Sequence, residues 1–269
     1  MERFDAHEAI KDIVYWIKHY FAESGPNSKA VIGISGGKDS TITAALLVEA
    51  LGNDRVVGVM MPCGGQRDAR DAYEVCEMLG IKSYEVEIGD AMTKLTEALP
   101  EDIFGCNNEI YYTNTPARLR MTTLYAIAGL IGGRVANTCN MSEDFVGYST
   151  KWGDNAGDFA VLANYTVAEV IAIGEALQLP PHFIYKTPDD GMSGKSDEEK
   201  LGITYEEIDM YIMYGVVPSA SSLAKMRTLY DRSRHKVKHM PTAPNPFWHK
   251  HKHNRMQTAA HLEEGDYWF

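Results

Sequence analysis

The sequence has few cysteines, no surplus of positive charge and no long apolar run. Its four cysteines are scattered without a C-x-x-C pair, which argues against a zinc knuckle or a disulfide framework and favours reduced thiols. No apolar stretch is long enough to cross a bilayer, and the acidic start Met1–Asp5 is not typical of a signal peptide. A net charge of −11 argues against nucleic acid as a partner. We therefore expect a cytoplasmic globular protein that acts on neither nucleic acid nor membranes.

What the chain does contain is an alternation of apolar strands and amphipathic helices. This pattern predicts an α/β fold, a doubly wound parallel sheet flanked by helices in a single domain. Ligands of such sheets bind beyond the carboxyl ends of the strands, so Ser35, Gln66 and Thr138 should face one crevice. Strands are expected at 30–34, 55–61, 81–88 and 134–138, and helices at 10–21, 41–51, 68–79, 90–99, 115–127, 166–177, 204–214 and 219–239.

Two connections attract attention. Residues 100–114 read as irregular, with Thr115 as N-cap and Pro116 as the first residue of the next helix. Residues 186–202 are rich in glycine and acidic side chains, which favours a mobile surface loop. We expect that loop to close over a bound nucleotide.

The most informative stretch joins the first strand to its helix and reads Ser35-Gly36-Gly37-Lys38-Asp39-Ser40. Adjacent glycines tolerate positive φ and close approach of a ligand, and a helix N-terminus attracts anions. Gly-Gly alone fits an ordinary tight turn equally well. A carboxylate beside a phosphate site makes sense if Mg²⁺ joins them. The spacing is not that of the G-x-x-x-x-G-K-[ST] loop.

Ser-Gly-Gly-x-Asp-Ser resembles the pyrophosphate loop of the ATP pyrophosphatases, which split ATP into AMP and pyrophosphate. The resemblance implies that ATP is a co-substrate and that Mg²⁺ is required. It implies an ATP site composed of Gly33, Ile34, Ser35, Gly36, Gly37, Lys38, Asp39, Ser40 and Thr138.

A second polar stretch, residues 138–158, follows the fourth expected strand. Its Thr138, Glu143, Lys151 and Asp158 are spaced as in the NAD synthetases. Further similar motifs, which extend the resemblance over essentially the whole chain, are Asn114–Met121, Gln66–Ala72, Ser196–Gly202 and His235-Lys236. The resemblance implies an adenine nucleotide alpha hydrolase-like fold, with an ATP pyrophosphatase core at about 28–165 of a domain spanning 1–269 and a helical C-terminal part.

The resemblance also implies a reaction. The carboxylate of deamido-NAD attacks the α-phosphorus of ATP, and ammonia then attacks the acyl-adenylate to give NAD and AMP. Asp39 and Lys151 would be catalytic, and Asp39 and Glu143 would bind Mg²⁺. The implied protein is a homodimer that uses free ammonia rather than glutamine. The implied deamido-NAD residues are Arg118, Lys151, Asp158, His235 and Lys236.

Each of these residues also has a plainer interpretation. Glu143 could be a first-turn acid in a helix capped by Ser142, and Lys151 could cover the ring of Trp152. Arg118 alone could be a solvated helix residue. The tail His249–His253 could bind a metal or be a solvated basic tail.

Two positions depart from the family pattern. Val167 stands where the family has a lysine that reaches ATP, and Asp189 stands where it has a hydroxyl residue. Lys186 or Lys195 could supply the missing cation. Two other functions therefore stay open: another amidating or thiolating enzyme of the ATP pyrophosphatase type, or a nucleotide-binding paralogue that has lost activity.

Overall fold

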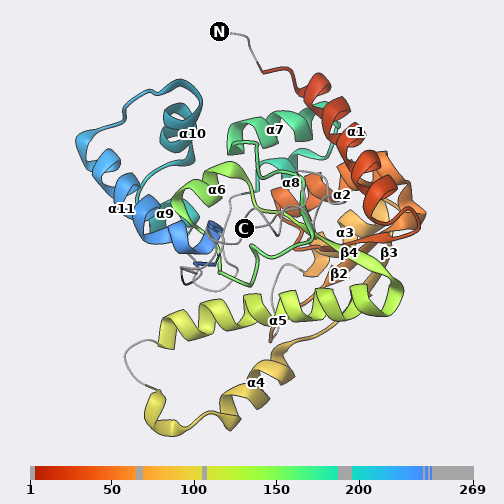
Figure 1. The fold of residues 1–269 in the computed structure, drawn as a ribbon, viewed down its shortest axis with the longest axis horizontal. Helices are drawn as coiled ribbons and strands as arrows, with labels where there is room; N and C mark the ends of the chain where they lie inside the picture. Colours follow the sequence, from red (N-terminus) through yellow and green to blue (C-terminus); the bar gives the residue numbers. More distant parts are fainter. Residues whose placement is uncertain are drawn as a thin grey trace, which may run out of the picture. The chain divides into compact units, whose positions relative to one another are not determined.

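The computed structural model describes residues 4–64, 69–104, 108–186 and 196–238, together with residues 240, 241 and 243 (Figure 1). Met1–Val237 form one compact unit, and Lys238–Phe269 form another. All helices and strands described here belong to the first unit. The assignment of residues 1–269 to a single domain stays a prediction.

The centre of the first unit is a parallel sheet in the order β3-β2-β1-β4-β5. This confirms the predicted doubly wound arrangement, with β1 central and the strand order reversing between β1 and β4. Val31 lies opposite Val57 on one side and Val135 on the other. The strands are β1 (Lys29–Gly33), β2 (Val56–Met60), β3 (Lys82–Glu85), β4 (Gly133–Asn137) and the short, unpredicted β5 (Phe159–Ala160).

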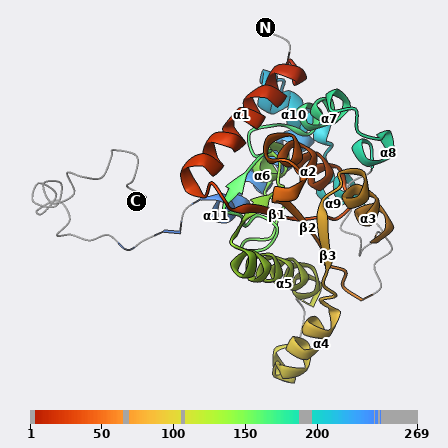
Figure 2. The same cartoon turned by 90° about the vertical axis from the view of Figure 1, so that its right-hand side faces the viewer.

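Alternate residues of the central strand face two different cores. Ala30 and Ile32 pack into the larger core, and Val31 packs into the core beneath α5 (Asn108–Ile131). The helices therefore lie on both faces of the sheet, as Figures 1 and 2 show. The larger core is completed by α1 (Ala6–Ser24), α2 (Lys38–Leu51), α3 (Ala69–Met78), α7 (Val167–Ala176) and α8 (Pro181–Ile184).

A third, smaller apolar cluster holds the C-terminal helices together. Its buried members include Val146 from α6 (Met141–Val146), Leu201 from α9 (Asp197–Leu201), Ile208 from α10 (Tyr205–Tyr214) and Met226 from α11 (Ala220–Val237). Capping boxes at Thr166 and Thr204 begin α7 and α10, as the sequence predicts. The remaining elements are α4 (Gly89–Ala98) and the 3-10 turns η1 (Asn53–Arg55) and η2 (Glu101–Ile103). Among the described residues, no helix combines the length and apolarity needed to span a membrane.

The predicted start of α5 is wrong. The helix begins at Asn108, so Pro116 lies inside it rather than at its first position. A proline inside a helix removes one backbone hydrogen bond, and tertiary contacts can offset that loss. Tyr111 supplies such contacts, because its hydroxyl lies 2.9 Å from Thr96 Oγ1 and its ring packs edge-on against Phe104.

The prediction of a loop over residues 186–202 is wrong for its last part. Residues Asp197–Leu201 form α9, which begins with a capping box between Ser196 and Glu199. Asp197, Glu198 and Glu199 lie in the first turn of this helix, where the helix dipole favours acidic side chains. Asp197 is buried and accepts a hydrogen bond from the Tyr148 hydroxyl at 2.8 Å. Residues 187–195, and with them Asp189, Lys195 and the expected lid, lie outside the described residues.

Candidate active site

The loop between β1 and α2 packs directly against α3. Gly36 has φ +73°, and a Cβ atom there would lie 2.6 Å from Asp71 Cβ and 2.8 Å from the Ala72 nitrogen. Only glycine fits this combination of positive φ and close backbone contact. α2 begins at Lys38 rather than at the predicted residue 41, so Lys38, Asp39 and Ser40 form its first turn.

Hydroxyl groups fix the shape of this loop. Ser35 Oγ lies 3.0 Å from Ser40 Oγ and accepts from the Gly37 backbone N–H at 3.2 Å, and Thr41 Oγ1 donates to the Gly37 carbonyl at 2.8 Å. The N-cap of α2, Gly37, has no side chain with which to cap the helix. The loop therefore presents a helix N-terminus without a side-chain cap, which is a favourable environment for an anion.

A cleft of about 1270 Å³ opens beside the loop, at the carboxyl ends of β1, β2 and β4. Ser35 and Thr138 both line it, which confirms the crevice expected for them; Gln66 lies outside the described residues. Gly36 is not a lining residue, because it faces α3. The other predicted ATP residues that line the cleft are Gly33, Ile34, Gly37, Lys38, Asp39 and Ser40.

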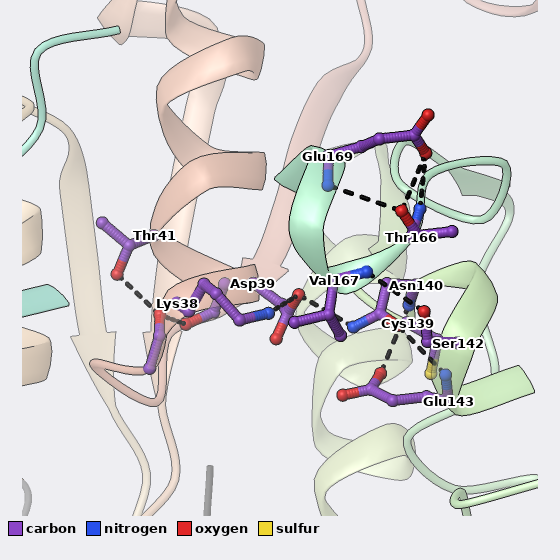
Figure 3. Close-up of polar contacts among 12 residues, drawn as sticks. Lys38, Asp39, Thr41, Cys139, Asn140, Ser142, Glu143, Thr166, Val167 and Glu169 are labelled. Atoms are coloured by element: carbon purple, nitrogen blue, oxygen red, sulfur yellow. Dashed lines mark hydrogen bonds and ion pairs between the residues drawn. The ribbon is translucent and has the colours of Figure 1, made fainter. Parts of the chain in front are cut away.

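Asp39 and Glu143 approach the cleft from α2 and α6, and Asn140 links them (Figure 3). Asn140 Nδ2 donates to Asp39 Oδ1 at 3.1 Å, and the Asn140 backbone N–H donates to Glu143 Oε2 at 3.2 Å. Asn140, not Ser142, is the N-cap of α6, so Glu143 completes a capping box. The plainer interpretation of Glu143 is thus partly right, although the side chain also lines the cleft.

The electrostatic surroundings of Glu143 are unusual. Burial and the nearby negative charge of Asp39 raise the pKa of Glu143 well above its ordinary value, and the positive charge of Lys38 opposes this. A pair of carboxylates in which Asp39 disfavours the charge of Glu143 is a suitable set of ligands for a divalent cation.

The N-terminus of α7, where Val167 departs from the family pattern, is already occupied by other parts of the chain. The Val167 N–H donates to Ser142 Oγ at 3.1 Å, and the Ala168 N–H donates to Asp209 Oδ2 at 2.8 Å. Ser142 also donates to Asp209, which is only 4% exposed. Burial raises the pKa of Asp209, against the effect of these hydrogen bonds. Neither of these two backbone N–H groups is therefore available to a nucleotide.

Most of the predicted deamido-NAD residues do not line the cleft. Arg118 Nε donates to the Lys151 carbonyl at 3.2 Å, and Lys151 Nζ lies 5.4 Å from the centre of the Trp152 ring. Lys151 thus makes the aromatic contact that its plainer interpretation foresaw. His235 lies in the last turn of α11, where Nδ1 is 2.9 Å from the Arg232 carbonyl. The structure does not bring these residues to the cleft of their own chain.

Asp158 and Lys236 make mainly backbone contacts. Asp158 Oδ2 accepts from the Val135 N–H at 2.7 Å, which ties the start of β5 to β4. The Lys236 ammonium donates to the carbonyls of Gly147 and Ser149 at 2.8 Å each, and burial lowers its pKa. Lys236 lines the main cleft, and both residues line a second cavity of about 270 Å³.

Two cleft residues were missed by the sequence predictions. Arg120 Nε donates to the Met61 carbonyl at 3.1 Å, and burial lowers the pKa of Arg120. Asp154 accepts from the Thr150 N–H at 2.6 Å, and burial raises the pKa of Asp154. Arg120 stands two residues after Arg118 in the same motif, so the motif itself contained the signal.

Comparisons with known proteins agree with one another. Residues 9–252 match the NAD synthase family. The ammonia-dependent NAD synthetase of Thermococcus sibiricus is 38% identical over 219 residues, covering 81% of this chain and 84% of that protein. The enzyme of the same name from Carboxydothermus hydrogenoformans is 32% identical, covering 90% and 99%.

Solved structures give the same result. An NMN synthetase from Francisella tularensis superposes with a TM-score of 0.82 at 33% identity, covering 90% of this chain and 100% of that one. A NAD synthetase from Burkholderia pseudomallei gives 0.70 at 27% identity, covering 87% and 91%. Because the family match spans most of the chain and the sequence relatives exceed 30% identity over most of their lengths, this chain belongs to the NAD synthase family.

Proposed function

We propose that this protein is an ammonia-dependent NAD synthetase that amidates deamido-NAD at the expense of ATP. The observation that carries the proposal is the Ser35–Ser40 loop at the mouth of the cleft, in a chain that matches the family over residues 9–252. The nicotinate carboxylate oxygen attacks the α-phosphorus and pyrophosphate leaves. Ammonia then attacks the acyl carbon, and AMP leaves with the oxygen that came from the carboxylate.

The chain has little covalent chemistry to perform in this scheme, because neither step needs a protein nucleophile. Its task is to align the reactants and to neutralise charge on the phosphates. The hydroxyls of Ser35 and Ser40 and the free amides at the start of α2 would bind phosphate oxygens. Thr138, on the same cleft, would contact the nucleotide.

The donor set at Asp39 and Glu143 fits a magnesium ion. Both side chains offer hard carboxylate oxygens, and the negative charge of Asp39 raises the cost of charging Glu143. No group of three or more metal-binding side chains gathers among the described residues, so phosphate and water oxygens would complete the coordination. Bound Mg²⁺ would neutralise charge that develops on the phosphates.

We further propose that the enzyme is a homodimer whose substrate sites span the interface. Arg118, Lys151 and His235 do not line the cleft of their own chain, so their expected role requires the cleft of a second copy. Exposed apolar side chains on α5, such as Leu130 at 85% exposure, offer a surface for that copy. An equal mixture of inactive Asp39→Asn and Arg118→Ala chains would then recover about a quarter of the activity, because half the dimers are mixed and each has one intact site.

One structural relative with a different activity motivates a second candidate substrate. The Francisella tularensis protein is an NMN synthetase, which suggests nicotinate mononucleotide as the acid to be amidated. Competition between this mononucleotide and deamido-NAD in one reaction, with NMN and NAD quantified by mass, distinguishes the two substrates.

The decisive assay supplies ATP, Mg²⁺, ammonium and deamido-NAD and measures NAD, AMP and pyrophosphate. Equal amounts of the three products support the proposal. AMP and pyrophosphate without NAD would point to another amidating or thiolating enzyme, and no ATP cleavage would point to an inactive paralogue. The cytoplasmic location stays a prediction; Cys63, Cys76 and Cys139 are free thiols.

A further inference from the structure

Lys38 is an unusual residue for its place in the fold. It is the first residue of α2, where the helix dipole disfavours a positive charge, and its side chain is only 4% exposed. A lysine is rarely buried unless it is paired. Both the helix dipole and burial therefore disfavour the positive charge of Lys38, and the surrounding structure must offset that cost.

The offset comes from carboxylates. Lys38 Nζ lies 2.7 Å from Asp39 Oδ1, the same oxygen that accepts a hydrogen bond from Asn140 Nδ2 (Figure 3). The positive charge of Lys38 also acts on Glu143 and on Asp209. The ammonium thus stands against the carboxylate pair to which the proposed function assigns the metal.

Asp39 cannot bond fully to both cations. Mg²⁺ accepts only close oxygen ligands in a nearly ideal geometry, so metal binding would compete with the ion pair for Asp39. The ammonium would then lose this partner, and Lys38 lines the same cleft as Gly37 and Ser40, where phosphate oxygens would bind. Among the basic residues that line the cleft, Lys38 belongs to the Ser35–Ser40 loop. The others lie on other segments of the chain: Arg120, Lys186, Lys200 and Lys236.

The start of α7 carries no side-chain positive charge. Val167, the first residue of α7, is apolar and 9% exposed, so α7 begins without a cation at the position that departs from the family pattern (Figure 3). Lys38 on α2 could supply the positive charge that the start of α7 does not.

We propose that Lys38 is an exchangeable counter-ion: its ammonium neutralises Asp39 in the free enzyme and transfers to the nucleotide phosphates when magnesium takes over Asp39. This rests on the proposed function, since it presumes that ATP and Mg²⁺ bind in the cleft. If the Lys38–Asp39 ion pair were only structural, removing the charge of Lys38 would leave the affinity for the nucleotide unchanged.

The test separates metal binding from nucleotide binding. Mn²⁺ binding to the nucleotide-free protein is measured by electron paramagnetic resonance. Binding of an ATP analogue with a methylene bridge between the α and β phosphates is measured by calorimetry, with Mg²⁺ present. In Lys38→Met we expect Mn²⁺ to bind about tenfold more tightly and the analogue about tenfold more weakly, because one charge-assisted contact is lost.

Three further variants make the result interpretable. Lys38→Arg keeps the charge and should keep analogue affinity within about threefold. Lys38→Gln replaces Lys38→Met if the latter does not fold. Lys29→Met is the matched control: its ammonium donates to the Asp54 carbonyl at 3.3 Å, and it does not line the cleft, so neither affinity should change.

Unchanged Mn²⁺ affinity in Lys38→Met, or unchanged analogue affinity, overturns the exchange. A lower melting temperature with both affinities unchanged identifies the ion pair as structural only, which also overturns it. If the unmodified protein does not bind the analogue with Mg²⁺, the proposed function fails instead.

Discussion

The close packing of the phosphate loop on α3 makes Gly36→Ala a sharp test of the site. The left-handed backbone at φ +73° would cost an alanine about 1–2 kcal/mol. The new methyl group would also lie 2.6 Å from Asp71 Cβ and 2.8 Å from the Ala72 nitrogen, and backbone cannot move aside as a flexible side chain can. Overpacking of this kind adds about 1–3 kcal/mol. We therefore expect a loss of about 2–5 kcal/mol in the free energy of unfolding.

Gly215→Ala provides the matched control. Gly215 has φ +67°, but no atom lies within 4 Å of a Cβ placed there. It carries the conformational cost without the clash, so it should lose only about 1–2 kcal/mol. Equilibrium urea unfolding with equal m-values measures both variants. Gly36→Ala should also weaken binding of the methylene analogue, whereas Gly215→Ala should not. If both variants lose equal stability and bind the analogue equally, the packing of the loop on α3 does not position the site.

Three other predictions follow from the same structure. Asp39→Ala would leave the buried Lys38 ammonium without its partner, so Asp39→Asn is the cleaner variant. The turnover of Asp39→Asn should fall about a thousandfold or more through lost metal binding. Near-normal turnover would exclude Asp39 as a metal ligand. Burial holds the pKa of Asp209 above its unfolded value, so its contribution to stability is full below about pH 4 and is lost as pH rises through the folded pKa. Urea unfolding between pH 4 and 8 should therefore show Asp209→Asn losing less stability with rising pH than the unmodified protein, and parallel curves would contradict this. Finally, the purified protein should form NAD from ammonium and not from glutamine at a comparable rate, as product quantification by mass would show.

The sequence predicted those features that rest on local chemistry. Capping boxes at Thr166 and Thr204 predicted the starts of two helices, and the alternation of apolar strands with amphipathic helices predicted the parallel sheet. The start of α5 could not be predicted in this way. Proline is favoured at the first position of a helix, and the contacts of Tyr111 that override this preference come from Thr96 and Phe104, which lie outside the helix.

The candidate site likewise contains residues whose positions could be predicted from the sequence and residues whose contacts could not. Ser35 and Thr138 reach one cleft because the carboxyl ends of neighbouring parallel strands meet there. The partners of Arg118 and Asp158, a carbonyl and a backbone N–H, carry no signature in the sequence. Spacing identifies which residues stand together in a motif, but it does not show which of them face the same cavity.

The hydrogen bonds of Asp209 bear on how this protein opens and closes. Its carboxylate joins Ser142 on α6, Ala168 at the start of α7 and its own helix α10, so none of these three can separate without leaving a buried polar group unpaired. The amide proton of Ala168 should therefore exchange with solvent only when α7 separates from α10, and that of Val167 only when α7 separates from α6. Helices α6, α7 and α10 would then open as a single cooperative unit, and we expect movements that admit substrate to come from segments outside this junction.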